Sequence, residues 1–212
     1  MRTIMTMNQK GGCGKSTIAS NLASYYAANG KSVTVVDLDP QGCTLEWLKA
    51  RPQDRPVIHG IRGWKDEIKI AKDTDVVIYD APAGTHGKDL TPMLKRVQTA
   101  LIPVLPSPID MRACAHFIQD ILTMGRVSRD EVKLAVIANR VREHTLIYQS
   151  LETFLTALDI PFVTTLRDTQ NYIRAAERGL GIFEMAPSAV EFDLEQWQPL
   201  IKWLNSKRST PQ

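Results

Sequence analysis

The stretch NQKGGCGKST, residues 8–17, holds three glycines, two lysines and two neighbouring hydroxyl side chains. The apolar segment Thr3–Met7 precedes it and the helical pattern Lys15–Asn29 follows it, so the stretch lies between a predicted strand and a predicted helix. Glycines let backbone N–H groups surround a phosphate because no Cβ is in the way. The positive end of the helix dipole points at the same anion. The stretch therefore predicts a phosphate-binding loop on an α/β fold.

The end of this loop predicts contacts with Mg²⁺-ATP. We expect Lys15 to reach the β- and γ-phosphates, Ser16 to be a Mg²⁺ ligand and Thr17 to meet the α-phosphate. The usual phosphate-loop pattern G-x-x-x-x-G-K-[ST] wants glycine where this chain has Gln9, and the loop instead follows K-G-G-x-G-K-[ST]. The alternative interpretation is a glycine-rich turn with two solvated lysines. The predicted nucleotide-binding residues are Gly11, Gly12, Cys13, Gly14, Lys15, Ser16 and Thr17.

Apolar, β-branched runs alternate with segments of helical spacing along the whole chain. This alternation predicts a doubly wound α/β fold, a mostly parallel sheet with helices on both faces, in a single P-loop domain spanning residues 1–212. The predicted strands are Thr3–Met7, Ser32–Asp37, Val76–Asp80, Ala100–Val104, Lys133–Asn139 and Phe162–Thr165. The predicted helices are Lys15–Asn29, Gln41–Ala50, Trp64–Lys72, Met111–Arg126, Leu146–Leu158 and Ala189–Asn205.

Three aspartates stand at predicted strand ends, where such sheets bind ligands. Asp37 and Asp39 lie on the same side of an extended segment, so both can face the phosphates. Asp80 closes the apolar run Val77-Ile78-Tyr79, and we expect it to hold Mg²⁺ through a water molecule. The competing interpretation is that each aspartate caps the helix that follows. Asp37, Asp80 and Ser16 are the predicted metal-site residues.

The composition is that of an ordinary globular protein, with 43% hydrophobic and 23% charged residues and a net charge of +3. No stretch approaches the roughly 18 consecutive apolar residues of a membrane span, and the phosphate loop leaves no room for a signal peptide. The three cysteines form no C-x-x-C pair, which argues against a disulfide framework or a zinc site. Cys13 is either a small residue at a variable position or an oxidation-sensitive thiol. We expect a soluble, cytoplasmic protein that does not bind membranes.

Five motifs together resemble the ParA/MinD family of deviant Walker A ATPases. They are KGGCGKST at 10–17, DLDPQG at 37–42, DAPAG at 80–84, LIPVLPSPID at 101–110 and IANR at 137–140. The first three are highly specific in combination, and the last two are weaker. The resemblance covers nearly the whole chain, and it implies a short member of the ParA branch, because the loop begins at residue 10.

The resemblance implies a role for several residues. Lys10 would be the signature lysine that crosses to the phosphates of a partner subunit, so that ATP is held between two subunits of a homodimer. Asp39 would position the hydrolytic water, with Asp37 beside it in the Mg²⁺ shell, and Asn139 would read adenine. Such proteins hydrolyse ATP slowly, bind nonspecific chromosomal DNA and so position a cargo such as a plasmid, a carboxysome or a chemosensory cluster. An adaptor protein on the cargo stimulates hydrolysis. We therefore expect Lys10, Lys15 and Asp39 to be catalytic and the protein to associate with the nucleoid.

Two surfaces compete as the binding partner of such a protein. Nonspecific DNA binding needs Lys and Arg side chains that reach phosphates, although isolated arginines are often only solvated surface. A MinD-like membrane helix would need the apolar pattern from Val190 to Leu204 to lie on lipid. Pro199 interrupts that pattern and its polar face is acidic, so we expect the helix to pack on the sheet. We expect the polar segment Ser206–Gln212 to be frayed. The candidate DNA contacts are Arg140, Arg142, Arg167, Arg174 and Arg178, with Lys202, Lys207 and Arg208 further along.

Two other enzyme classes remain as alternatives. Iron–sulfur reductases share the phosphate loop but need cysteines for a cluster between subunits, and Cys43 and Cys114 do not clearly stand where a loop could offer them. A small-molecule kinase or ligase would need a substrate pocket, for which the sequence has no signature.

Overall fold

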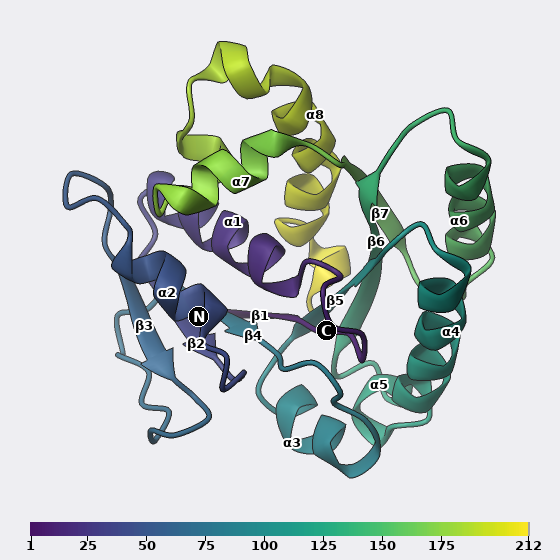
Figure 1. Ribbon diagram of the computed structural model, residues 1–212. Coiled ribbons are helices and arrows are strands. Elements are labelled where there is room, and N and C mark those ends of the chain that lie inside the picture. Colours follow the sequence, from purple (N-terminus) through teal and green to yellow (C-terminus); the bar gives the residue numbers. More distant parts are fainter. Residues whose placement is uncertain (212) are drawn as a thin grey trace.

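A parallel sheet of seven strands forms the centre of the computed structural model, which describes residues 1–211 apart from the side chains of Lys88 and Ser128 (Figure 1). Gln212, the last residue of the predicted domain, lies outside this range. The strand order β3-β2-β4-β1-β5-β6-β7 confirms the predicted doubly wound arrangement. The strands are β1 (Arg2–Thr6), β2 (Val33–Asp37), β3 (Ile58–Arg62), β4 (Val76–Asp80), β5 (Thr99–Val104), β6 (Lys133–Val141) and β7 (Phe162–Arg167).

Helices cover both faces of the sheet, as expected (Figure 1). The α-helices are α1 (Lys15–Ala28), α2 (Cys43–Lys49), α3 (Leu90–Leu94), α4 (Pro108–Leu122), α5 (Gly125–Ser128), α6 (Leu146–Thr156), α7 (Gln170–Glu177) and α8 (Pro187–Leu204). Three short 3₁₀ helices join them, η1 (Gly87–Asp89), η2 (Ile182–Glu184) and η3 (Lys207–Ser209).

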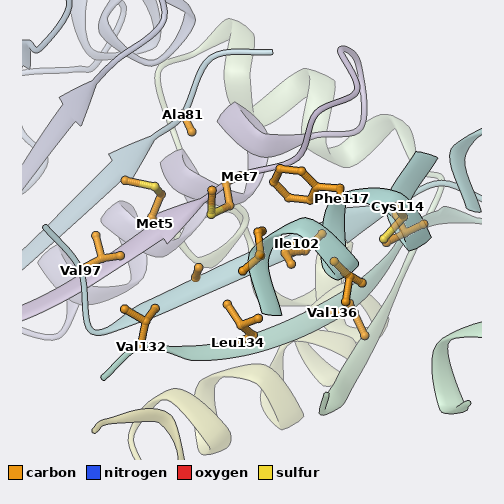
Figure 2. Packing of buried hydrophobic residues seen from close by; sticks show 14 of the residues in the cluster. Met5, Met7, Ala81, Val97, Ile102, Cys114, Phe117, Val132, Leu134 and Val136 are labelled. Carbon is orange, nitrogen blue, oxygen red and sulfur yellow. The ribbon is translucent and has the colours of Figure 1, made fainter. Parts of the chain in front are cut away.

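Alternate strand residues point to two separate hydrophobic cores. On β1, Ile4 packs in the core beneath α1 and α8, whereas Met5 packs in the core beneath α3, α4 and α6. Figure 2 shows part of the second core, in which Cys114 and Phe117 of α4 lie beside Ile102 of β5. Burial on both faces explains why the strand sequences are continuous apolar runs. It also holds the carboxyl ends of the strands in fixed positions beneath the site.

The predicted helix Trp64–Lys72 is wrong, because this segment forms turns, a bend and irregular backbone. Ile68 and Ile70 both pack against the core, while the residues between and beside them are exposed. That burial has a period of two, which belongs to extended backbone and not to a helix. Just before this segment, the edge strand β3 was not predicted. Only one of its five residues is buried, so it lacks the apolar run that marks the central strands. It is held in the sheet by pairing with β2 alone.

Two other predicted helices also differ from the structure. The helix predicted over Met111–Arg126 is divided in two, since α4 ends at Leu122 and α5 begins at Gly125. Helix α4 begins earlier than predicted, since Ser107 is its N-cap, accepting a hydrogen bond from the Asp110 N–H at 3.3 Å, and Pro108 follows at the first helical position. Helix α8 runs through Pro199 without ending there. It packs on the sheet as expected, with Val190 and Trp197 fully buried. Within residues 1–211, no helix combines the length and the apolar character that crossing a membrane requires.

The expectation of a frayed segment 206–212 is also wrong for its described residues. Ser209 is fully buried, and its carbonyl and hydroxyl accept hydrogen bonds from the Arg2 guanidinium at 3.0 and 2.9 Å. The Ser209 hydroxyl donates in turn to the carbonyl of Leu204 at 2.8 Å. These contacts fasten η3 to the first strand, which residue polarity alone did not indicate.

Candidate functional site

The predicted phosphate loop lies between the carboxyl end of β1 and the start of α1, as its sequence context required. Gly12 and Gly14 have φ angles of 74° and 97°, which a side chain would strain. Space also excludes a side chain at Gly14, since a Cβ there would lie 2.1 Å from the Nδ2 atom of Asn139. The loop is braced from β5 as well, where the carbonyl of Pro103 accepts a hydrogen bond from the Asn8 side chain at 2.7 Å. The backbone is therefore preset in its curled conformation.

The Lys15 side chain is buried and turned back over the loop. Its amino group donates to the carbonyl of Lys10 at 3.0 Å, and only 7% of the residue is exposed. The Cys13 thiol donates to the same carbonyl at 3.3 Å. Burial raises the pKa of the Cys13 thiol, so it stays protonated, which favours the interpretation of Cys13 as a small packing residue. The arrangement presents a cation at the place where the loop encloses an anion.

Two buried aspartates lie beside the loop. Asp37 and Asp80 end the neighbouring strands β2 and β4, where they are paired in register, and they are 0% and 1% exposed. Burial above all, together with the charge of Asp37, raises the pKa of Asp80 to about 7, against the lowering effects of the Ser16 and Thr44 hydroxyls and of the Lys15 charge. Two carboxylates so close together are short of positive charge.

This donor set fits Mg²⁺ that is bound together with a phosphate group. No cluster of three or more His, Cys, Asp or Glu side chains suited to a metal is found in the part of the chain that the structure describes. Mg²⁺ usually takes one or two carboxylates and completes its shell with water and substrate phosphates. The Ser16 hydroxyl is close enough to Asp80 to lower the pKa of that carboxyl, so both could share such an ion. The structure thus brings together the three predicted metal-site residues.

Asp39 lies in the turn between β2 and α2, half-buried at the edge of the site. Its N–H donates to Asp37 Oδ1 at 3.0 Å, and its own carboxylate accepts from the Gln41 N–H at 2.9 Å. The turn is therefore held to the metal-site aspartate through the backbone, while the Asp39 carboxylate remains accessible to solvent. The predicted role of Asp39 in positioning water stays a prediction.

A cavity of about 270 Å³ adjoins the phosphate loop. Asn139, at the end of β6, forms part of its wall and donates from its amide to the carbonyl of Cys13 at 2.8 Å. Asn139 therefore braces the loop, whether or not it reads adenine as predicted. Arg140 has a φ angle of 53°, a conformation that non-glycine residues adopt rarely and that is enriched at functional sites. The cavity is lined by Gly12, Gly14, Thr17, Asn139, Arg140, Arg167, Asp168, Thr169, Tyr172 and Ile173.

Four of these lining residues, Asp168, Thr169, Tyr172 and Ile173, were missed by the sequence analysis. They follow β7 directly or lie on α7, so the rule that ligands bind beyond the carboxyl ends of strands was the available signal. Thr44 was missed as well, and it contacts both Asp37 and Asp80. It carried no signal, because one threonine in a helical segment is unremarkable until its neighbours are known.

The five arginines predicted to contact DNA fall into two groups. Arg140 and Arg142 both pair with Asp168, at 3.5 and 3.2 Å, and Arg167 pairs with the buried Asp193 at 2.5 Å. Arg174 and Arg178, on α7 and at its C-cap, are exposed and form no ion pair with any residue between 1 and 211. The first group is partly neutralised, whereas the second is free to meet an anion.

The two cysteines considered for an iron–sulfur cluster lie in different environments. Cys114 is fully buried in the core beneath α4, and Cys43 is exposed at the start of α2. A buried core thiol cannot reach a cluster shared between subunits. This geometry argues against the iron–sulfur alternative.

Known proteins share both the sequence pattern and the fold. The maintenance of carboxysome distribution protein A of Halothiobacillus neapolitanus is 28% identical over 190 residues, which cover 86% of this chain and 87% of that protein. Among solved structures, apo McdA of Cyanothece has a TM-score of 0.75 at 14% identity, covering 97% of this chain and 100% of that chain. A putative plasmid partition protein of Borrelia burgdorferi, bound to AMPPNP, has a TM-score of 0.71 at 15% identity, covering 95% and 98%.

The family model named CobQ/CobB/MinD/ParA nucleotide binding domain matches residues 4–182. This range begins in β1 and ends at the start of η2, so it takes in the phosphate loop, the strand-end aspartates and the cavity beside them. With this match and the preset phosphate loop, the chain belongs to the CobQ/CobB/MinD/ParA nucleotide-binding family.

Proposed function

We propose that this chain is a slow ATPase that dimerises when it binds ATP, binds nonspecific DNA in that state and positions a cargo in the cytoplasm. The cargo would be a plasmid or a protein assembly such as a carboxysome or chemosensory cluster, and its adaptor would stimulate hydrolysis. The observation that carries the nucleotide part is the preset loop, with the buried Lys15 on one side and the buried Asp37–Asp80 pair on the other. The likeness to a carboxysome distribution protein along most of both chains supports the positioning part.

The loop and its neighbours would bind the nucleotide through fixed donors. Backbone N–H groups of residues 11–17 surround the phosphates, Lys15 supplies the buried charge, and the cavity beside Asn139 takes the nucleoside. Mg²⁺, when bound, neutralises phosphate charge as it develops during transfer. Ser16 and Asp80 would hold the ion, and Asp37 would support them. The half-buried Lys10 would extend from the loop to the phosphates of a second subunit.

Asp39 would then orient the attacking water from the edge of the site. Its backbone is tied to Asp37, so the carboxylate keeps its place relative to the metal site. An Asp39→Ala variant is expected to bind ATP and dimerise like the wild type but to stall in hydrolysis, which phosphate-release measurements would detect. Turnover equal to that of the wild type would move the water-positioning role elsewhere, to Asp37 first.

The DNA surface would centre on the unpaired cations. Arg174 and Arg178 are exposed without an ion-pair partner among residues 1–211. A second basic group surrounds a groove of about 930 Å³ at the opposite end of the sheet, and no carboxylate lines that groove. Because Arg140, Arg142 and Arg167 are already paired with aspartates, we expect each of them to contribute less to DNA binding. The cations of the second group are Lys202, Lys207 and Arg208, together with Lys133, which is itself paired with Asp130.

The test of this function is binding to random-sequence duplex DNA with ATP, ADP or no nucleotide, across a salt series, with light scattering on the same samples. We expect a doubled mass and DNA binding with ATP only, and an affinity that falls steeply with salt. In the double variant Arg174→Ala, Arg178→Ala, the slope of log affinity against log salt should fall by about 2 while dimerisation is kept. A matched double variant, Lys202→Ala with Lys207→Ala, tests the groove. DNA binding that is equal in all nucleotide states would contradict the proposal.

A further inference from the structure

Thr44 lies between the two aspartates of the proposed metal site. It is the second residue of α2 and is 1% exposed. Its hydroxyl oxygen is 2.7 Å from Asp37 Oδ2 and 3.1 Å from Asp80 Oδ2. Its backbone N–H also donates to Asp37 Oδ2, at 3.1 Å. A single side chain thus contacts both carboxylates at the ends of β2 and β4.

The hydroxyl can satisfy only one of the two carboxylates, because it has one proton. The shorter distance identifies Asp37 as the acceptor. Asp37 then receives three donors, the hydroxyl and N–H of Thr44 and the N–H of Asp39. Both of its oxygens are hydrogen-bonded within the protein, so its negative charge is stabilised by the turn that carries Asp39.

Asp80 is left in a different position. Its Oδ2 atom faces the Thr44 oxygen, and its other contacts are the hydroxyls of Ser16 and, at 3.3 Å, Thr6. The Thr44 oxygen packs between the two carboxylates, which keeps Asp80 from turning toward Asp37. Asp80 therefore stays directed toward Ser16, with less compensation of its charge than Asp37 has.

We propose that Thr44 is a positioning residue of the magnesium site, whose hydroxyl binds Asp37 to the Asp39 turn and keeps Asp80 directed toward Ser16. The inference rests on the proposed binding of Mg²⁺ with a nucleotide. It assigns the two aspartates different roles: Asp80 would contact the ion, and Asp37 would hold the surrounding protein groups in place. Thr44 then ties the turn that carries Asp39 to the ion, because the same hydroxyl contacts both aspartates.

The experiment measures how free Mg²⁺ changes the affinity for a fluorescent ATP analogue, mant-ATP, in the full chain. Thr44→Val removes the hydroxyl with little change of shape, and Thr44→Ser keeps it. We expect Thr44→Val to raise the Mg²⁺ concentration at the midpoint about tenfold, the usual effect of losing an outer-shell partner. Thr44→Ser should restore the wild-type midpoint. Affinity for mant-ATP in EDTA should be the same in all variants, because the phosphate loop is unchanged.

The matched control is Thr34→Val, which removes another buried hydroxyl from β2. Among the hydrogen bonds of residues 1–211, the Thr34 hydroxyl contacts only that of Thr74. An unchanged Mg²⁺ midpoint in Thr44→Val, or an equal shift in Thr44→Ser, would overturn the assignment and leave Thr44 a packing residue. If Thr44→Val does not fold, Thr44→Ala makes the same comparison with a smaller side chain. A wild-type protein that binds no mant-ATP in either condition would refute the proposed function itself, which separates the two failures.

Discussion

At the scale of a single residue, Lys15 is a buried cation whose interactions within residues 1–211 are incomplete. Its amino group is buried, yet its hydrogen bond within residues 1–211 goes to one neutral carbonyl, that of Lys10, and no carboxylate forms an ion pair with it. A buried charge is costly to keep unless it is paired. An anion bound in the loop would provide the missing partner, so the burial of this charge favours anion binding.

Replacing Lys15 by alanine is therefore expected to weaken nucleotide binding strongly. A hydrogen bond to a charged group contributes about 1.5–3 kcal/mol, so the affinity should fall by about 10- to 150-fold, and further where the charge is desolvated. Isothermal titration with ATP would measure the loss. The exposed Lys31, replaced by alanine, is the control. Normal affinity in Lys15→Ala would show that the loop does not bind phosphate.

Asp80 makes the stability of the nucleotide-free protein depend on pH. Burial, with the Asp37 charge adding to it, raises its pKa from 3.8 to about 7. The folded state thus holds the proton more tightly than the unfolded chain does. This contribution to stability is complete below about pH 4 and is lost as the pH rises to about 7, by up to about 4 kcal/mol.

Asp80→Asn should remove that pH dependence. Urea unfolding in EDTA between pH 4.5 and 8 would compare the variant with the wild type. The free energy of unfolding of the variant should exceed that of the wild type increasingly as the pH rises. A constant difference across this range would mean that Asp80 does not titrate as described.

At the scale of elements, one short segment after α7 joins the two helices that flank the site. Ile182 of η2 donates from its N–H to Asn21 of α1 at 2.6 Å, and the carbonyl of Leu180 accepts from the Trp47 indole of α2 at 3.1 Å. Arg51, just beyond α2, forms a two-point ion pair with Glu184 at 2.9 and 2.6 Å. Both side chains of that pair are 5% exposed or less. The segment therefore fixes α1 and α2 relative to each other.

Glu184→Gln is expected to destabilise the fold strongly, because it leaves the buried Arg51 without a counter-charge. Breaking a buried pair in this way costs about 3–5 kcal/mol. Urea unfolding would measure it. Glu46→Gln, which breaks the exposed pair with Lys49 on α2, should change the free energy of unfolding by less than about 1 kcal/mol. Equal effects of the two substitutions would contradict this account.

At the scale of the whole molecule, the proposed dimer depends on the Lys10 side chain, which forms no ion pair within residues 1–211. This side chain is half-buried, while the Lys10 backbone N–H donates to Asn8 at 3.1 Å. The loop thus keeps its shape without the Lys10 amino group. That independence allows the side chain to serve a second subunit.

Lys10→Ala should bind ATP with nearly the affinity of the wild type yet remain monomeric. Light scattering in ATP, ADP and no nucleotide would show a single mass in the variant and a larger mass for the wild type with ATP only. The nucleotide affinity of the monomer serves as the control for an intact loop. If Lys10→Ala still dimerises in ATP, Lys10 is not required for the interface.

The parts of this protein that the sequence predicted are those governed by local chemistry. The phosphate loop follows from glycine conformations and one helix start, and the aspartates at 37, 39 and 80 follow from apolar runs that end in a charge. Strands that are buried on both faces can likewise be recognised from their apolar runs. The edge strand β3 and the irregular segment at Ile68 and Ile70 could not be recognised in this way, because their residues depend on neighbours distant in sequence.

By itself the sequence determined the α/β class, the strands that are buried on both faces and the glycine-rich loop that opens the first helix, since these depend on contacts within a few positions along the chain. Only the tertiary structure decided that Thr44 lies between two aspartates, that Arg167 is paired with Asp193, and that Ser209 is bound to Arg2. Each of these pairs joins residues 7 to 207 positions apart. Partners at such separations are chosen by how the strands pair and how the helices pack, and local spacing carries no record of that choice.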